Sequence, residues 1–561
     1  GTRMLKRWLL RPLLKVDSIV SRQECISSLV SDSIILAKLR ETLGKIGDLE
    51  RLLSKMVLGG RNPRDLFALS NSLSFLPEVK ETLQNTKLSF LSERIYQLQE
   101  VSEKILNSLR SELPMTLSEG GVIADGVDPR LDELRALLRD GDCWLREYEE
   151  KERATTGIKT LKVRKNSVFG FFIEISKSFI GQAPSHYVRK QTLANGERYI
   201  SADLKDYESK IFSANDRLIA LEKEIFEGLI EIVRGKVQEI QSTAEAVAEI
   251  DSLASLSQIA RERGFIRPNI VDEEVIAIVE GKHPVVEAFL PSGSFVPNEA
   301  SLDSEDHRIA IITGPNMAGK STYLRQVALI VLLAQIGSFV PAQEATIGVV
   351  DRIFTRVGAS DNLVRGQSTF MVEMMETSAI LNNATRKSFL ILDEIGRGTS
   401  TFDGLSLAWA IIEYIHEKIG ARTLFATHYH ELTDLEFVRP GIFNLNVAVS
   451  HQDSTGEVVF LHKIQNGAAN KSYGIEVAKL AGIPTPVLCR AKEVLFELEK
   501  TESHEAERMA GSQSHAPLPT QLSLFHPHDE LLEVVRQIDI NSLTPLEALN
   551  LLSRLKSLAN G

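Results

Sequence analysis

The fold of the second half of the chain is decided by one stretch, Gly314-Pro315-Asn316-Met317-Ala318-Gly319-Lys320-Ser321. An apolar run at 309–313 before it predicts a buried strand, and residues 322–330 after it predict a helix. A strand, a glycine-rich loop ending in Lys-Ser and a helix are the parts of a phosphate-binding loop. In such a loop, backbone N–H groups and the positive end of the helix attract phosphate oxygens.

A nucleotide site at this loop gives each residue a role. Lys320 is expected to reach the β- and γ-phosphates, and the Ser321 hydroxyl is expected to bind Mg²⁺. A chance match is the alternative, expected in roughly one chain of this length in fifty. The strand and helix on either side make chance less frequent still. The predicted ATP-binding residues of the loop are Gly314, Pro315, Asn316, Met317, Ala318, Gly319, Lys320, Ser321 and Thr322.

Two adjacent carboxylates form a second chemical centre. The apolar run 388–392 predicts a strand that delivers Asp393 and Glu394 at its carboxyl end, where α/β proteins bind ligands. Asp393 is expected to hold Mg²⁺ directly or through water, and Glu394 to orient and deprotonate the attacking water. A strand ending in Asp-Glu is weak evidence by itself. In one domain with the phosphate loop, it indicates an ATPase.

A third strand, predicted at 423–427, ends in His428. Its imidazole is expected to sense a γ-phosphate, which completes the predicted catalytic set Lys320, Glu394 and His428. A structural histidine is the alternative, and only the flanking motifs favour the site. His428 and His430 also have metal-ligand spacing, but Mg²⁺–nucleotide chemistry is the stronger interpretation.

Two polar, glycine- and serine-rich segments, 365–374 and 396–404, lie near the predicted γ-phosphate position. Such segments suggest that one subunit completes the site of another, because a second helix N-terminus facing the phosphate supplies further N–H groups.

Length and composition limit the classes of protein that fit. The 561 residues predict several domains, and no apolar run is long enough to cross a bilayer. A net charge of −11 means that nucleic-acid contact is local rather than spread over the surface. Three distant cysteines predict neither a zinc site nor a disulfide framework and favour a reducing cytoplasm. No signal peptide opens the chain, and the absence of an initiator Met suggests a piece of a longer protein.

The first 264 residues have a different organisation. Residues 1–145 predict helices, for which a scaffold is the plain interpretation. Strands are expected at 158–163 and 168–175, joined by a turn at 165–167. A helix from about 215 to 260, bent at Gly228 or Gly235, then returns the chain. Helices of this length suggest rigid arms that carry a small β-element at the tip.

Basic residues gather in the β-element. Lys162 and Arg164 alternate along one strand and therefore share a face. A platform for a phosphate backbone and an ordinary solvated face are both open interpretations, because nothing here reads bases. The candidate DNA contacts are Lys162, Arg164, Lys165, Lys177, Arg189 and Lys190.

The motifs together resemble the MutS family of DNA mismatch-repair ATPases. The resemblance rests on segments 313–322, 368–374, 393–400 and 426–429, and on 187–193 and 197–199 for the DNA clamp of the family. It implies a multidomain α and α/β fold with core and lever helices at 1–145, a clamp at 146–210 and a returning lever helix at 211–264. An ABC-type ATPase at 265–500 follows, with a dimerising helix-turn-helix at about 465–500.

The resemblance also implies residue roles that the motifs alone do not. Ser368 would contact the γ-phosphate bound by the partner subunit, Asn316 would lie against the phosphates, and Phe295 would lie against adenine. ATP and Mg²⁺ are the implied cofactors of a homodimer. A MutL-type repair factor and double-stranded DNA are implied partners.

The C-terminal tail adds a separate indication. Residues 501–528 predict a flexible linker, and Gln521-Leu522-Ser523-Leu524-Phe525 within it resembles the peptide that docks repair proteins on the replication sliding clamp. Leu524 and Phe525 would fill an apolar pocket while Gln521 fixes register. A chance apolar patch is the alternative. Residues 529–561 resemble the helical tetramerisation element of bacterial members.

One family feature is missing. Family members read mismatches with an N-terminal Phe-x-Glu wedge, and this chain is expected to begin after that domain. Phe172-Ile173-Glu174 has the same letters but lies in a predicted strand, where alternation explains it. The implied function is an ATP-switched clamp on mismatched DNA that signals to repair factors, near the bacterial nucleoid. A family scaffold that encircles branched or recombining DNA is the alternative. A nuclease module or a transporter ATPase fits less well.

Overall fold

The computed structural model describes residues 1–60, 62–84, 86–166, 170–291, 293–315, 318–357, 369–452, 457–468 and 473–510. They fall into two units, Gly1–Gly474 and a unit that begins at Ile475. Within these residues, every helix is too short or too polar to span a membrane.

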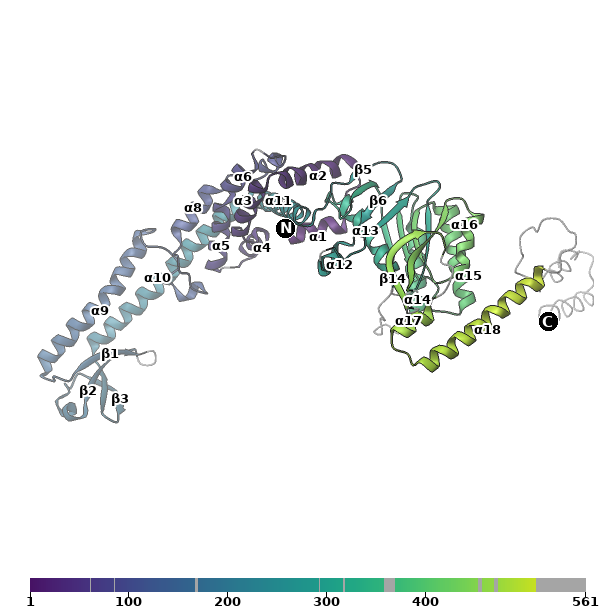
Figure 1. Ribbon diagram of the computed structural model, residues 1–561. Coiled ribbons are helices and arrows are strands. Elements are labelled where there is room, and N and C mark those ends of the chain that lie inside the picture. The colour runs from purple at the N-terminus through teal and green to yellow at the C-terminus, as the bar shows by residue number, and fades with distance from the viewer. Residues whose placement is uncertain are drawn as a thin grey trace, which may run out of the picture. The chain divides into compact units, whose positions relative to one another are not determined.

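Helices make up the first part of the larger unit (Figure 1). Their bounds are α1 Thr2–Leu10, α2 Val16–Ser31, α3 Ser33–Lys45, α4 Leu49–Val57, α5 Pro63–Ser74, α6 Leu76–Leu83, α7 Ser89–Ser92, α8 Gln99–Ser108, α9 Pro129–Thr156, α10 Ala202–Gly235 and α11 Val237–Arg263. The helices expected over residues 1–145 are thus confirmed as separate elements. Helix α4 ends at Val57, and the Asn62 side chain accepts from the Arg64 N–H to begin α5.

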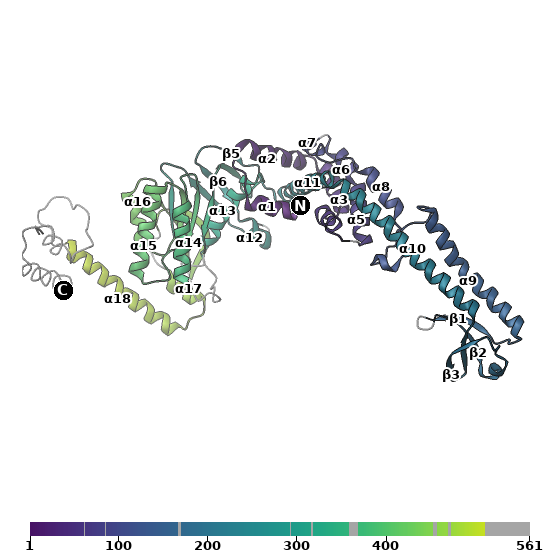
Figure 2. The same ribbon diagram turned by 180° about the vertical axis from the view of Figure 1, so that it is seen from behind.

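The two arms, α9 and α10, lie side by side in both views (Figures 1 and 2). Asp128 caps α9 and Ser201 caps α10, each through a side-chain oxygen that accepts backbone N–H groups. The helical segment expected over 215–260 is confirmed, whereas the expected bend at Gly228 is not, because α10 runs through that residue. The segment is divided into α10 and α11 at Lys236, directly after Gly235, one of the two expected bends.

A four-stranded antiparallel sheet lies at the far end of the two arms, in the order β1-β2-β4-β3, and falls between α9 and α10 in sequence (Figure 1). The strands are β1 Lys162–Asn166, β2 Gly170–Ser176, β3 Val188–Leu193 and β4 Gly196–Ile200. The prediction that the first strand begins at 158 is wrong, because it begins at Lys162. Ile158 and Leu161 are fully buried outside the strand, so their apolar pattern signalled core packing rather than extended backbone.

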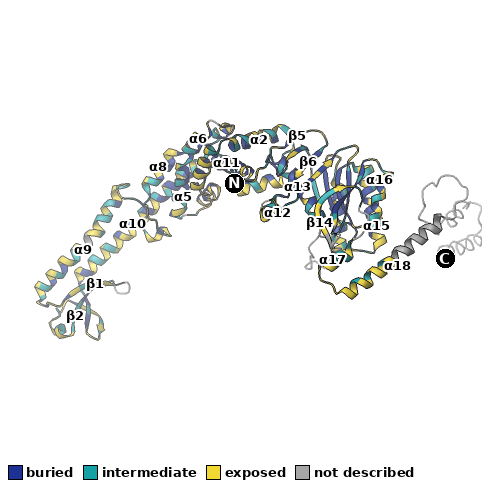
Figure 3. Ribbon diagram, in the orientation of Figure 1, coloured by how far each residue is buried: buried dark blue, intermediate teal, exposed yellow. Residues whose placement is uncertain are grey.

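The α/β part of the larger unit contains a six-stranded sheet, in the order β10-β11-β12-β8-β13-β14. Its strands are β8 Ile309–Thr313, β10 Ile353–Arg356, β11 Phe389–Asp393, β12 Arg422–Ala426, β13 Ile442–Gln452 and β14 Glu457–Asn466. All pairs are parallel except β13 with β14. Figure 3 shows these strands mainly in the colour of buried residues. The three strands predicted near the phosphate loop are thus confirmed as neighbours β11, β12 and β8.

Helices cover both faces of this sheet. Helix α13 (Lys320–Gln335) packs with Ala310 and Ile312, whereas α14 (Thr369–Asn383) and α15 (Thr401–Tyr414) pack with Ile309 and Ile311. Alternate residues of β8 therefore pack against helices on opposite faces of the sheet, which explains the continuous apolar sequence of this strand.

A second sheet, in the order β5-β9-β6-β7, completes this part. Its strands are β5 Asn269–Val271, β6 Ile276–Gly281, β7 Asn298–Leu302 and β9 Glu344–Gly348. The short helix α12 Pro284–Phe289 lies between β6 and β7 in sequence, and the short helix α16 Leu435–Val438 precedes β13 of the six-stranded sheet. The described part of the second unit consists of α17 (Gly474–Leu480), a turn and α18 (Thr485–Ala510).

Candidate functional site

The phosphate loop joins β8 to α13 and takes its shape from two glycines. Gly314 has φ +135° and Gly319 has φ +110°, conformations that side chains rarely tolerate. A Cβ at Gly314 would also lie 3.3 Å from Val447 Cγ2 on β13. Asn316 and Met317 lie outside the described residues, as do Ser368 and the docking residues Gln521, Leu524 and Phe525.

Lys320 is buried at the first position of α13, and its ammonium donates a hydrogen bond to the Gly314 carbonyl oxygen across the loop. Burial lowers the pKa of Lys320, and the charges of Glu394 and Asp393 act in the opposite direction. The ammonium thus faces the centre of the loop, where a phosphate would sit.

Asp393 ends β11 and pairs in register with Ala426 on β12. Burial raises the pKa of Asp393, while a hydrogen bond from the Ser321 side chain lowers it. Among the described residues, the buried Oδ1 of Asp393 has no hydrogen-bond partner. An unsatisfied carboxylate oxygen beside a serine hydroxyl fits a Mg²⁺ ion, because both are hard oxygen donors.

Glu394 follows directly and has a left-handed backbone, with φ +53°. This conformation costs a residue with a side chain about 1–3 kcal/mol and persists only where the surroundings impose it. The Glu394 N–H donates to the Ala426 carbonyl oxygen at 2.9 Å. Its Oε2 lies 2.5 Å from Arg397 Nη1.

His428 lies two residues beyond the end of β12, and its ring centroid is 4.1 Å from that of Tyr429. Burial lowers the pKa of His428, against the opposing charge of Glu394. A neutral imidazole can both donate and accept a hydrogen bond. The carboxyl ends of β8, β11 and β12 therefore bring Lys320, Asp393, Glu394 and His428 into one electrostatically coupled group.

Sequence reasoning missed His462 and gave no role to Arg397. His462 on β14 has φ +52°, and its Nδ1 lies 2.9 Å from the Ala318 carbonyl oxygen of the phosphate loop. Nothing in the sequence near 462 signals this contact, because only the pairing of β14 with β13 brings it there. Arg397 did have a signal, since it lies three residues after Glu394 in a glycine-rich loop.

Phe295 is half-buried in the segment that leads into β7. Asn298, at the start of β7, donates to the His462 carbonyl oxygen at 2.9 Å and accepts from the Ile464 N–H at 2.7 Å. These bonds place the Phe295 segment beside β14. Its contact with adenine stays a prediction.

The basic residues of the small sheet divide between its two faces. One row across the sheet pairs Lys162 with Glu174, Glu174 with Arg198, and Arg198 with Gln191. Because Arg164 lies two residues after Lys162 on β1, its side chain is on the same face as this row. On that face, the Arg198 guanidinium lies 4.3 Å from the Phe172 ring centroid. Lys165 and Arg189 belong to rows that face the other way, toward Phe171 and Tyr199. Lys190 lies at a register shift in β3, and Lys177 begins a short 3-10 helix.

Arg189 is further restrained by an ion pair with Glu197 at 3.3 Å. The sequence therefore grouped side chains that the sheet separates. Lys162 and Arg164 keep the shared, exposed face that alternation predicted.

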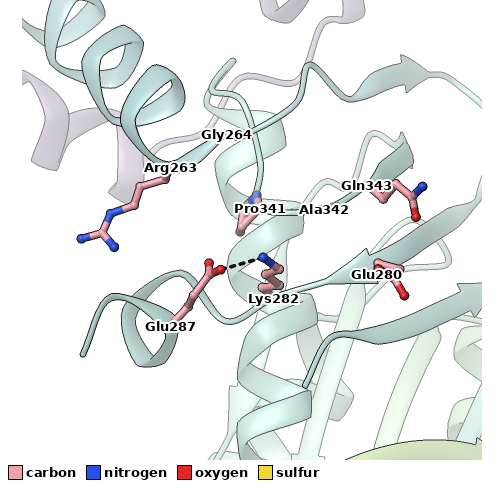
Figure 4. A pocket seen from close by; sticks show the side chains of 8 residues that line it. All are labelled: Arg263, Gly264, Glu280, Lys282, Glu287, Pro341, Ala342 and Gln343. Carbon is pink, nitrogen blue, oxygen red and sulfur yellow. Dashed lines mark hydrogen bonds and ion pairs between the residues drawn. The ribbon is translucent and has the colours of Figure 1, made fainter. Parts of the chain in front are cut away.

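A separate small pocket lies where α11 ends beside β6 (Figure 4). Within it, Lys282 Nζ donates to Glu287 Oε1 at 2.7 Å. It contains none of the predicted site residues; its lining is Arg263, Gly264, Glu280, Lys282, Glu287, Pro341, Ala342 and Gln343.

Comparison with known proteins covers nearly the whole chain. Three family models match it: MutS domain III at residues 1–257, MutS domain V at 310–499, and the DNA mismatch repair protein MutS C-terminal region at 526–558. Proteins named DNA mismatch repair protein MutS from Acetivibrio thermocellus and Ruminiclostridium cellulolyticum are each 48% identical to it over 100% of its length. One from Solibacter usitatus is 48% identical over 99% of it.

The chain spans 65% of the first two relatives and 64% of the third. Matches of this identity, together with models that follow one another along the sequence, agree with the fold and the order of the motifs. The chain belongs to the MutS family.

Proposed function

We propose that this chain hydrolyses ATP and uses the cycle to control a DNA clamp in mismatch repair. The observation that carries the proposal is the convergence of Lys320, Asp393, Glu394 and His428 at the carboxyl ends of the parallel strands β8, β11 and β12. Relatives of the chain are named for DNA mismatch repair, which supports the biological setting.

In this proposal the phosphate loop binds the triphosphate. Backbone N–H groups between Gly314 and Ser321 and the start of α13 attract its charge, and the Lys320 ammonium exchanges the Gly314 carbonyl for phosphate oxygens. The segment that holds Phe295, together with the nearby His462, would lie against the adenine ring of ATP. Asn316 would lie against the phosphates.

Glu394 is the proposed general base. Its carboxylate would accept a proton from the attacking water, and a neutral His428 would hydrogen-bond near the γ-phosphate. Ser321 and Asp393 would hold Mg²⁺, which neutralises charge on the phosphate oxygens when bound. The orphaned Asp393 Oδ1 supports this assignment.

A dimer completes the site in this proposal. Ser368 of one subunit would contact the γ-phosphate held by the other, and the α17–turn–α18 segment would provide dimer contacts. Lys162 and Arg164 would contact double-stranded DNA, and the 521–525 peptide would dock on a sliding clamp. A MutL-type factor would receive the signal.

The test compares the wild-type chain with Glu394→Ala. We expect the variant to bind a fluorescent ATP analogue normally while its Mg²⁺-dependent hydrolysis falls by about a hundredfold or more, because it lacks the base. Glu417→Ala is the control: this glutamate pairs with Arg439 and its side chain is 44% exposed. Normal turnover by Glu394→Ala would show that the base is another group.

A further inference from the structure

Glu373 is a buried carboxylate on α14 that the proposed hydrolysis does not use. Only 4% of the residue is exposed, and its two oxygens have different partners. Oε2 lies 3.3 Å from Nη2 of the buried Arg356 on β10. Oε1 accepts the Gly396 N–H at 2.5 Å.

Gly396 lies two residues after Glu394, in a tightly confined peptide. It has φ +89°, and a Cβ there would lie 2.5 Å from the Gly404 carbonyl oxygen. The Tyr429 hydroxyl donates to the Gly396 carbonyl oxygen at 3.0 Å. Glu373 therefore holds the N–H of this residue while Tyr429 holds its carbonyl group.

The same loop meets α14 at a second point. A Cβ added to Gly398 would lie 2.9 Å from Phe370 Cβ, so helix and loop are in close contact there as well. A shift of α14 along or across the sheet must therefore move the loop or break these contacts.

Glu394 is sensitive to such a shift. Its left-handed backbone is held by the 2.9 Å bond to Ala426 on one side and by the confined Gly396 on the other. Misplacing a catalytic group by about 1 Å can cost a hundredfold in rate. The backbone that carries the proposed base thus depends on a carboxylate that takes no part in the proposed hydrolysis.

We propose that Glu373 is a positioning residue, which fixes the base Glu394 through Gly396 and ties that position to the placement of α14. The inference rests on the proposed function, since it needs Glu394 to be the base. If the start of α14 meets a partner's ATP, the same link makes hydrolysis in one subunit respond to nucleotide in the other.

A plain structural role is the competing explanation, in which Glu373 only neutralises Arg356. The two roles separate because Glu376 also pairs with Arg356, with Nε and Oε2 3.2 Å apart. Removing the acceptor at 373 leaves Arg356 that partner but leaves the Gly396 N–H unbonded. Replacing the carboxylate by an amide keeps one oxygen acceptor for the Gly396 N–H, removes the charge and turns an NH₂ donor toward Arg356, which keeps Glu376 as its anionic partner.

The experiment measures ATP-analogue affinity and single-turnover hydrolysis for Glu373→Met, Glu373→Gln and the control Glu376→Gln. We expect Glu373→Met to hydrolyse about 10- to 100-fold more slowly with affinity changed less than about twofold. Glu373→Gln and Glu376→Gln should stay within about threefold of wild type. Equal losses in the Met and Gln variants, or normal hydrolysis by Glu373→Met, would overturn the inference.

Two further variants test whether Glu373 acts on Glu394 through Gly396. In a Glu394→Ala background, Glu373→Met should cause no additional loss, and a full additional loss would contradict action through the base. Tyr429→Phe, which removes only a hydroxyl, should slow hydrolysis in the same pattern even if Glu373→Met fails to fold; a wild-type rate would count against the inference. An active Glu394→Ala variant would instead show that the base is another group, which refutes the role that the proposed function gives to Glu394.

Discussion

Arg397 and Glu394 form an ion pair in which Nη1 of the guanidinium lies 2.5 Å from Oε2 of the carboxylate. The arginine side chain is 61% exposed and the glutamate side chain only 20%. The Arg397 charge also lowers the pKa of His428 and of Lys320, after the larger effect of burial in each case. An exposed cation is thus paired with the proposed base and lies within the electrostatic field of the site.

This pair predicts that Arg397 contributes to ATP binding. We expect Arg397→Ala to raise the KM for ATP by about three- to fivefold, as for the loss of one partly solvated charge contact, with a smaller change in kcat. Arg397→Lys should retain most of the affinity. The control is Arg386→Ala, because Arg386 is 64% exposed and pairs with Glu274. Equal KM values for the two alanine variants would contradict the prediction.

The burial of Asp393 predicts that this carboxylate lowers the stability of the folded protein although hydrolysis needs it. Burial raises the pKa of Asp393 above its ordinary value of 3.8, so the folded, nucleotide-free protein disfavours the charged form. Protonated Asp393 therefore contributes stability to the folded protein. This contribution is fully present below pH 3.8 and is lost as pH rises through the raised pKa of Asp393. Asp393→Asn should therefore have a higher Tm than wild type near neutral pH while losing Mg²⁺-dependent hydrolysis.

Thermal unfolding without nucleotide, measured at several pH values, checks whether Asp393→Asn has the higher Tm. The difference in Tm should narrow as pH is lowered toward about 4, because wild-type Asp393 then becomes protonated. A variant less stable than wild type at neutral pH would mean that the charge of Asp393 is compensated in the folded protein.

The parts of the site that the sequence predicts are those encoded in one short segment. The loop from Gly314 to Gly319 lies between the strand and helix that its pattern predicts, Lys320 and Ser321 begin that helix, and Asp393 ends an apolar strand as expected. In each case the chemistry and the element that positions it are neighbours in sequence. Parallel pairing then brings the strand ends together, as the α/β pattern implies.

The missed features depend on contacts between distant segments. His462 reaches the phosphate loop from β14, and Glu373 reaches Gly396 from α14. Nothing near position 462 marks His462 in the sequence, and the segment 368–374, although it is singled out as a motif, gives Glu373 no role of its own. The early start predicted for β1 has a related cause, since burial of Ile158 and Leu161 in the core of the small sheet mimics a strand pattern.

The division of basic residues on the small sheet predicts unequal DNA contacts. If Lys162 and Arg164 each neutralise a phosphate, replacing both with alanine should reduce the slope of log K against log salt by about 1.8. Arg189→Ala is the matched control, because Arg189 belongs to the other face and pairs with Glu197 at 3.3 Å. Equal slopes for the control and the double variant would contradict the prediction that the face with Lys162 and Arg164 contacts the DNA phosphates. Duplex binding measured over a range of salt concentrations gives both values.

Arg22 connects the first helices to the end of the phosphate-loop helix. Its Nη1 donates to the Ile336 carbonyl oxygen, just beyond α13, at 2.6 Å. Its guanidinium carbon lies 3.6 Å from the centre of the Trp8 ring. Burial lowers the pKa of Arg22 to about 10, so the side chain stays charged at neutral pH.

Arg22→Ala should therefore weaken the packing of α2 against the end of α13. A charged hydrogen bond and a partly buried cation–π contact together contribute on the order of 2–3 kcal/mol. We expect a lower Tm and a lower urea midpoint, with Arg22→Lys in between because it keeps the charge but loses the planar stacking. Arg40→Ala on the exposed side of α3 is the control. If Arg22→Ala unfolds at the wild-type midpoint, other contacts of α2, such as Ile19 in the core beside α13, hold this junction without it.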